Sequence, residues 1–496
     1  MTGSWWGRDG SAGGGSPTLL DHARTLRAQH GPGPWPWSGD PLPDADPDGA
    51  RPVLVGGGAD ALLHRTPDHG AVPPTGVELA ERLELLLSAP VPTSGDEMGL
   101  LHDLLATCRA IEVADALSTE VRCRALPSEG LRRLGRQLAE HGTHREPVKI
   151  GLVLLGLGGD ARDRELLLLL GSLDELTLYA AVALRRSQPD GDLAVHALAR
   201  RVAGWGRIQA VRLLRGTTVP GIRAGLLREG FRNTVMNEYL AHLAATTGNL
   251  HGALRRPHVD TPLLAGAGGM LAAMAATQGG PAPGLADYPH AVPVLHRYAD
   301  LVQLRTPTLA MLRNLIDITV FLRHPPEDLP WTPADTGHLT TCHEQLLREP
   351  RWPALVLDHL ADPRRPDFHR ALGPAEFLRL STTPQLLARL ETGPALLDPV
   401  WAHALRTGHR RHAAHILDLA GRRLADTPSP RKPPPTCAPT AHPSRLAGGD
   451  TRARGSRHPR AVSEVTAIGG SGRGGRGSSA GRLHRVKILG FPMAFQ

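Results

Sequence analysis

The chain has 496 residues and a formal net charge of +8 at pH 7. This length suits two or three ordinary domains, or one repeat array, which has no single-core size limit. The positive charge is concentrated at one end, because residues 427–496 hold twelve Lys or Arg against two acids. The preceding residues are therefore close to neutral, which argues against nucleic-acid binding by that part. Leu, Ala and Arg are abundant and β-branched residues are scarce, a composition that favours an all-α fold.

Cysteine usage and hydropathy predict a cytoplasmic location for the chain. The four cysteines form no CxxC pair, so we expect reduced thiols. The N-terminus lacks a basic segment followed by an apolar one, so no secretory signal is predicted. The most apolar window, residues 263–280, is shorter than the roughly 20 residues that span a bilayer. We predict that it forms a buried helix.

Residues 1–50 are rich in Gly, Pro and Trp and predict a flexible or wrapping arm with one short helix at 18–29. Residues 51–63 contain a short β-like run that enters three glycines. Amphipathic patterns then predict helices at 77–88, 97–125 and 128–141.

Residues 148–251 are a ladder of short apolar helices separated by Gly, Asp and Pro breaks. Each segment is too short to be stable alone, so each must stack on its neighbours. This pattern is typical of an irregular α-solenoid of the HEAT or armadillo type. Helical patterns continue to about residue 425, so we predict one α-helical repeat domain over 51–426, wound as a right-handed superhelix from about residue 77.

Residues 427–496 have no periodicity and are rich in Arg, Pro, Gly and Ser, which predicts a disordered basic tail. One interpretation is a nucleic-acid-binding tail with RGG-like repeats. The other, which we favour, is a frameshifted or unselected tail, because a frameshift in a GC-rich gene gives this mixture.

Two glycine clusters match the GxGxxA pattern that brings a backbone close to a dinucleotide pyrophosphate: Gly56 with Gly58, and Gly156 with Gly158. Asp174 and Glu175 follow the second cluster near the offset expected of a ribose-binding acid. Neither cluster lies in a predicted βαβ unit, so a turn between helices is the favoured interpretation of both.

No metal site is predicted. His338 and Cys342 are four residues apart and could share a helix face, but the neighbouring sequence offers no further ligand. HExxH, GxSxG and GxxxxGK[ST] motifs are also absent from the sequence, which disfavours most familiar hydrolases and kinases.

The densest polar group within the ladder lies between residues 226 and 243, with two residues of the preceding repeat beside it. We predict that these side chains either cross-link adjacent repeats or form a binding site on the concave face of the solenoid. The candidates are Trp205, Arg207, Arg228, Arg232, Asn233, Asn237, Glu238 and His242.

The run WGRIQAVRLLRGTTVPGIRAGLLREGFRNTVMNEYLAHLAATTG, residues 205–248, resembles bacterial helical-repeat proteins labelled limonene hydroxylase. The resemblance extends over about residues 50–420. It implies monooxygenation of the small hydrophobic substrate limonene to carveol and perillyl alcohol. It also implies dehydrogenation of these alcohols to carvone and perillyl aldehyde with NAD(P). No catalytic residue can be carried over, because the group has no motif of known catalytic role.

The competing hypothesis is a non-enzymatic α-solenoid scaffold that binds a protein or peptide on its concave face. Allylic oxygenation requires haem, flavin or non-haem iron, and the sequence has no recognisable site for any of them. An enzyme predicts a bound cofactor, whereas a scaffold predicts a macromolecular partner.

Overall fold

A computed structural model describes residues 17–36, 42–44, 74–88, 95–277, 282–395, 398–407 and 412–425. The predicted tail at 427–496, the β-like run at 51–63 and most of the predicted arm lie outside these residues. Within them every regular element is a helix, which confirms the all-α prediction.

The first half of the array runs from α1 to α12, with one short 3₁₀ turn, η1. The elements are α1 (Leu19–His30), α3 (Gly76–Ser88), α4 (Gly95–Ala106), α5 (Ala110–Cys123), α6 (Ser128–His141), α7 (Arg145–Gly158), η1 (Ala161–Asp163), α8 (Arg164–Leu170), α9 (Thr177–Ser187), α10 (Gly191–Ala199), α11 (Gly204–Arg212) and α12 (Pro220–Gly225).

The second half begins with a π-helical turn, η2, and contains one further 3₁₀ turn, η3. The elements are η2 (Leu226–Gly230), α13 (Glu238–Gly248), α14 (Leu250–Leu254), α15 (Thr261–Ala276), α16 (Ala291–Gln303), α17 (Leu309–Arg323), α18 (Pro333–Leu347), α19 (Arg351–Ala361), η3 (Phe368–Ala371), α20 (Leu372–Phe377), α21 (Thr383–Glu391), α22 (Pro399–Thr407) and α23 (Ala413–Ala425).

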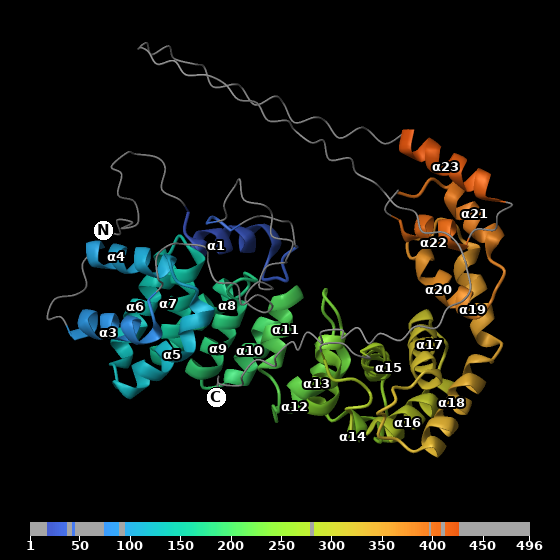
Figure 1. The fold of residues 1–496 in the computed structure, drawn as a ribbon, viewed down its shortest axis with the longest axis horizontal. Helices are drawn as coiled ribbons and strands as arrows, with labels where there is room; N and C mark the ends of the chain where they lie inside the picture. Colours follow the sequence, from blue (N-terminus) through green and yellow to red (C-terminus); the bar gives the residue numbers. More distant parts are fainter. Residues whose placement is uncertain are drawn as a thin grey trace, which may run out of the picture.

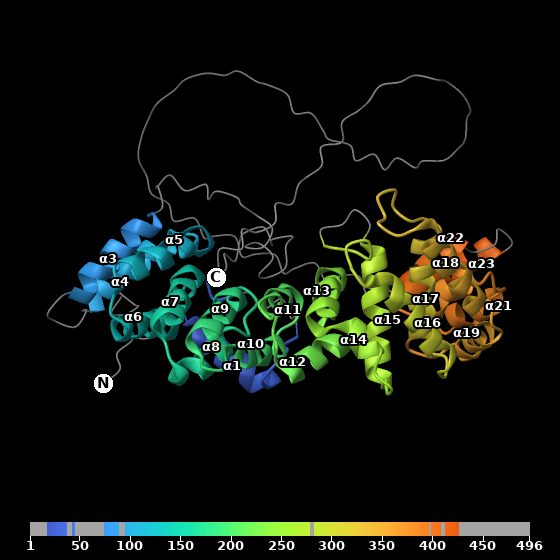
Figure 2. The same ribbon diagram turned by 90° about the horizontal axis from the view of Figure 1, so that it is seen from below.

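Most helices pack in two rows along an elongated array (Figure 1). We call α3, α5, α7, α9, α11, α13, α15 and α17 the odd row, because each contacts the next member of the series. In the second row α8 contacts α10, α14 contacts α16, and α16 contacts α18. Figure 2 shows α9, α11 and α13 lying together on one side of α8, α10 and α12. This stacking buries the apolar face that each short helix cannot bury alone.

One hydrophobic core runs through the array, from Leu19 in α1 to Ile416 in α23. The sixteen-residue α15 is buried along most of its length, as the apolar window predicts. A Cβ atom at Gly266 would lie 2.0 Å from the carbonyl oxygen of Leu227, so glycine is what allows α15 to approach η2. No helix of the described residues is long and apolar enough to cross a membrane.

The described part of the N-terminal arm is packed against the array. Helix α1 contacts α6 and α8, and it buries Leu19, Leu20 and Ala23 completely or almost so. The Leu19 amide donates to the carbonyl oxygen of Gly142 at 3.0 Å. Arg145 donates two side-chain hydrogen bonds, of 2.9 and 3.0 Å, to the carboxylate of Asp44. These segments therefore complete the second row.

The helix predicted at 97–125 is wrong as a single element, because it divides into α4 and α5. The Thr107 hydroxyl donates to the Leu104 carbonyl oxygen at 2.7 Å and ends α4. Helix α5 begins where the Ala110 amide donates to the Glu146 carboxylate at 2.6 Å. This carboxylate comes from α7, so the break depends on a tertiary contact that helical periodicity does not reveal.

Candidate functional site

The predicted polar group gathers where α11 and α13 begin. The indole of Trp205 is 5% exposed and packs on the Tyr239 ring, with 5.1 Å between ring centroids. The guanidinium carbon of Arg212 lies 5.9 Å from the centroid of the same ring. Trp205 is therefore a core residue that joins α11 to α13, and its surface is not available to a ligand.

Arg207 ties three segments together through backbone carbonyl groups. Its guanidinium donates to the oxygens of Ala199 at 2.6 Å, Arg232 at 2.6 Å and Glu229 at 3.0 Å. The Glu229 carbonyl group belongs to η2, and the Arg232 carbonyl group lies two residues after its end. Arg207 is thus a cross-link from α11 to the end of α10 and to η2 and the loop that follows it.

Asn233 and Asn237 organise the loop between η2 and α13. The Asn233 side-chain oxygen accepts from the amides of Val235 and Met236 at 2.9 and 2.8 Å. The Asn237 side-chain oxygen accepts from the Asn233 amide at 3.2 Å. These hydrogen bonds to side-chain oxygens replace the regular backbone hydrogen bonds that the loop lacks.

Three of the other four predicted residues have separate partners. Arg228 donates to the Asp260 carboxylate at 2.6 Å, and exposed Arg232 pairs with Glu229 at 3.0 Å. His242 Nε2 donates to the Asp287 carbonyl oxygen at 3.3 Å, and burial lowers the pKa of this imidazole. Glu238 is the first residue of α13. The structure brings Trp205, Arg207 and Asn233 together as contacts among α11, the loop after η2 and α13.

Asp174, in the turn before α9, has a different environment. A Cβ atom at Gly206 would lie 3.0 Å from a carboxylate oxygen of Asp174, so the acid lies directly against the first turn of α11. Burial, and next the charge of Glu175, raise its pKa to about 7. Within the described part of the chain this carboxylate has no hydrogen bond or ion pair. Such a group is a candidate functional acid or base.

The sequence does indicate that Asp174 has an unusual environment, although we considered this residue only as a candidate ribose-binding acid. The adjacent acids Asp174 and Glu175 interrupt two apolar segments, and a pair of like charges between buried helices indicates at least one perturbed carboxyl group. The residue that desolvates Asp174, Gly206, lies more than thirty positions away. Periodicity alone does not connect these two places.

Gly156 and Gly158 lie inside the last turn of α7 and make close contacts between helices. A Cβ atom at Gly158 would lie 2.3 Å from the Ser128 carbonyl oxygen, and one at Gly156 would lie 3.1 Å from the Cα atom of Ala183. The backbone is therefore covered by α6 and α9, and these residues do not fit a dinucleotide pyrophosphate. Gly56 and Gly58 lie outside the described residues.

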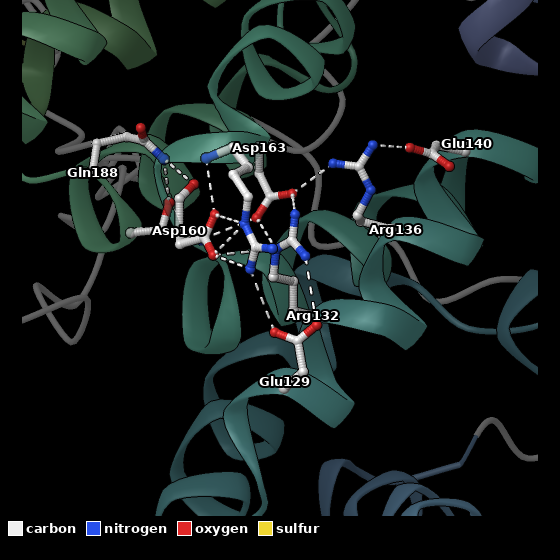
Figure 3. A network of polar contacts seen from close by, with 9 residues as sticks. Glu129, Arg132, Arg136, Glu140, Asp160, Asp163 and Gln188 are labelled. Atoms are coloured by element: carbon white, nitrogen blue, oxygen red, sulfur yellow. Dashed lines mark hydrogen bonds and ion pairs between the residues drawn. The ribbon is translucent and has the colours of Figure 1, made fainter. Parts of the chain in front are cut away.

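A closed polar network joins α6 to the turn between α7 and α8 (Figure 3). The fully buried Asp163 carboxylate accepts from Arg132 at 2.8 and 2.9 Å, from Arg136 at 2.7 Å and from the Asp160 amide at 2.9 Å. Burial acts to raise the pKa of Asp163, but these hydrogen bonds outweigh it and hold the pKa below its usual value. Every lone pair that faces the interior is used, so this network is structural.

A groove of about 440 Å³ opens on the neighbouring face of the array. It extends from the turn between α5 and α6, across the end of α7, to the end of α9. We call it the arginine groove, because Arg122 and Arg186 are its charged lining residues. Its other lining residues are Val121, Ala125, Leu126, Ser128, Leu131, Gly156 and Leu157.

No protein-family model, curated protein or solved structure matches this chain.

The pair His338 and Cys342 has neighbours that the sequence did not reveal. The His296 ring of α16 lies with its centroid 4.9 Å from that of His338 in α18. The side chain of His343 is fully buried, and this burial lowers the pKa of its imidazole to about 4. Even so, no three His, Cys, Asp or Glu side chains of the described ranges converge on a point that could hold a metal ion.

Proposed function

We propose that the chain is a helical-repeat scaffold of the HEAT or armadillo type that binds a segment of a partner protein on the surface of its odd row. The observation that carries this proposal is the packing of consecutive helices in two rows, each row in contact mainly through adjacent members. Such arrays present long open surfaces that suit extended ligands. The arginine groove lies on this surface and is open, as a docking segment requires.

The contacts between repeats support a rigid scaffold. Arg207 binds carbonyl groups of three segments, and Arg132 and Arg136 bind one carboxylate from two successive turns of α6. These contacts fix the angle between neighbouring helices, because each arginine has a planar set of donors with restricted geometry. A fixed angle keeps the binding surface preorganised, which lowers the entropic cost of binding.

A selection from a random peptide library tests this proposal. The full chain is immobilised and a displayed library of twelve-residue peptides is passed over it. We expect a set of related sequences to be enriched, and the corresponding synthetic peptides to bind in fluorescence anisotropy. A library that shows no enrichment over bare resin would contradict the scaffold proposal.

Oxidation of a monoterpene with NAD(P), which the resemblance implies, is the second proposal. One observation favours an enzyme: Asp174 has a pKa of about 7, the range in which a carboxyl group can exchange protons with a substrate at neutral pH. The described glycines do not fit a dinucleotide, so we derive no step through that cofactor. Limonene-dependent oxidation of NADH or NADPH by the purified full chain, lost in Asp174→Asn, would favour this proposal over the scaffold.

A cytoplasmic location remains a prediction. Cys108, Cys123 and Cys342 are free thiols in the structure, in agreement with a reducing compartment.

A further inference from the structure

We infer that the middle of the array binds an acidic segment of the partner protein through a row of basic side chains near the end of α13. This inference rests on the proposed scaffold function and names the chemistry of its partner. We call the row the basic ridge. It comes from α11, the turn after α11, α14 and the residue before α16 (Figure 1). Its members are Arg212, Arg215, His251, Arg255 and His290.

Charge is distributed unevenly along the array. Residues 193–258 hold ten arginines and two acids, whereas the rest of residues 1–426 holds 34 Lys or Arg against 44 acids. The nearly neutral total before residue 427 therefore contains one strongly basic segment, which extends from α10 to just after α14. A local excess of one charge attracts and orients partners of the opposite charge.

Four of the ten arginines in this segment have partners within the fold. Arg207 and Arg223 donate to backbone carbonyl groups, and Arg228 and Arg232 pair with acids. The guanidinium groups of the other six make no hydrogen bond or ion pair within the described part of the chain, and all six except the half-buried Arg201 are exposed. They are Arg200, Arg201, Arg212, Arg215, Arg255 and Arg256.

Three of these six arginines come from segments that meet at the C-terminal end of α13. The Gly216 amide, in the turn after α11, donates to the Thr247 hydroxyl at 3.4 Å, so this turn lies against the last residues of α13. Helix α14 begins two residues after α13 ends, and the two helices are in contact. The turn that carries Arg212 and Arg215 and the short helix that precedes Arg255 therefore share one neighbour.

Imidazole rings extend the ridge toward α16. The His251 ring stacks on the His290 ring, with 4.5 Å between centroids and 18° between ring planes. Burial, and next the charges of His290 and Arg255, lower the pKa of His251. The charge of Arg215 adds to the burial that lowers the pKa of His242. At neutral pH the charge of the ridge is therefore carried by its arginines, with imidazole groups beside them.

Stabilisation of helix ends does not account for this arrangement. Arg212 is the last residue of α11 and Arg255 follows α14, so each can interact with a helix dipole, for about 0.3–1 kcal/mol. Arg215 lies outside any helix and has no such role. Three neighbouring cations without an acid repel one another, and a segment with several carboxylates would balance all three.

An acidic protein segment suits the ridge better than a single-stranded nucleic acid does. Sites for single strands combine cations with exposed aromatic faces on which bases stack. Here the Tyr288 ring is 3% exposed and meets the His242 and His290 rings edge to face, at 6.1 and 6.0 Å between centroids. The rings of this region contact one another, whereas the arginine N–H groups can bind carboxylate oxygens.

Photo-crosslinking to the full chain tests the inference. The probe is a peptide of four glutamates, one benzoylphenylalanine and four glutamates, and its glutamine analogue is the uncharged control. Mass spectrometry maps each cross-link, which separates attachment at the ridge from attachment to the basic residues after position 426.

The ridge variant is Arg212→Gln/Arg215→Gln/Arg255→Gln. The matched control, Arg82→Gln/Arg133→Gln/Arg313→Gln, removes the same charge from exposed arginines of α3, α6 and α17. Circular dichroism checks that both variants keep the helical content of the parent. A third variant, Arg212→Lys/Arg215→Lys/Arg255→Lys, keeps the charge.

We expect the glutamate probe to attach within residues 209–217 and 249–256 of the parent and of the matched control, and the glutamine probe not to attach there. This attachment should fall at least about tenfold in the ridge variant, which corresponds to about 1.4 kcal/mol. The lysine variant should retain most of it, because the ridge acts mainly through charge.

Absence of attachment at the ridge of the parent, or equal attachment in the ridge variant, would overturn the inference. So would a nine-residue thymidine oligonucleotide that competes at lower concentration than a peptide of eight glutamates, since the ridge would then favour nucleic acid. Failure of the scaffold proposal is distinguishable, because the random library tests peptides of any charge. Enriched peptides without attachment at the ridge would leave the scaffold and remove the acidic segment.

Discussion

Asp163 and Asp174 are eleven positions apart, and both lie in short turns between buried helices, yet their surroundings are opposite. Asp163 is fully buried and receives hydrogen bonds from two arginines and a backbone amide, so its pKa is lowered. Asp174 is largely removed from water beside Glu175 without a donor in the described residues, so its pKa rises to about 7. The first carboxylate stabilises the fold, whereas the second destabilises it.

This difference separates buried polar groups that stabilise the fold from buried polar groups that destabilise it. We call the first class used and the second class tolerated. A buried charge without partners costs free energy, and a natural chain retains one mainly where function requires it. Asp174 belongs to the tolerated class, and Asp163 and Arg207 belong to the used class. Each prediction below tests one side of this division.

The largest effect is expected for Asp163→Ala. The change leaves Arg132 and Arg136 buried or half-buried without their shared carboxylate. Breaking a buried ion pair at one partner costs about 3–5 kcal/mol. Native-state hydrogen exchange at the amides of α6 and α8 measures the local free energy of opening. A loss below about 0.5 kcal/mol would place Asp163 in the same class as a surface residue.

Arg207→Ala should have the next largest effect. It removes three charge-assisted hydrogen bonds that join the end of α10, η2 and the residues just after η2. The expected loss is about 2–3 kcal/mol, seen as faster exchange at the first amides of α13. Arg207→Lys should recover little of it, because an ammonium group cannot reach all three carbonyl oxygens. Unchanged exchange in the alanine variant would show that Arg207 is not a cross-link.

Asp174→Asn should stabilise the chain in a pH-dependent manner. The pKa of this acid is about 7 in the folded chain against an ordinary value of 3.8, so the folded state binds the proton more tightly. The free energy of unfolding of the parent should therefore fall as pH rises from about 4 to about 7, and stay level above.

The Asp174→Asn variant lacks this fall. The full difference between the two pKa values corresponds to about 4 kcal/mol, and solvent at the partly exposed carboxyl group reduces it, so at pH 8 the variant should exceed the parent by on the order of 2 kcal/mol. Urea unfolding at pH 5 and pH 8 measures the difference. An equal gap at both pH values would contradict the assigned pKa.

The smallest effect is expected for Glu229→Gln. Its ion pair with Arg232 is exposed on both sides, so solvent screens the attraction. The change in stability should stay below about 0.5 kcal/mol in urea unfolding. A loss of the size expected for Asp163→Ala would remove the distinction between exposed and buried pairs.

Much of the fold could be predicted from the sequence, because helical periodicity and Gly or Pro breaks are local signals. The ladder at 148–251 predicted short stacked helices, and α7 to α14 occupy it. The division between α4 and α5 could not be predicted, since the Glu146 carboxylate that begins α5 comes from another helix. Gly156 and Gly158 resembled a cofactor motif, although they serve close packing between helices.

The candidate site was harder to predict, because it depends on residues distant in sequence. The polar run around Asn233 predicted either contacts between neighbouring segments or a binding site, and the Arg207 hydrogen bonds to the Glu229 and Arg232 carbonyl groups are contacts of the first kind. Arg122 and Arg186 are two of many arginines in the sequence, and nothing local distinguishes them. Their pairing arises only when α5 and α9 pack on either side of α7.

A comparison of Asp163→Asn with Asp174→Asn tests the division between used and tolerated polar groups most directly. Urea unfolding of each full-chain variant at pH 8 gives the change in the free energy of unfolding. The account predicts a loss of about 3 kcal/mol or more for Asp163→Asn and a gain for Asp174→Asn. A loss of similar size in both variants, or no change in either, would contradict it.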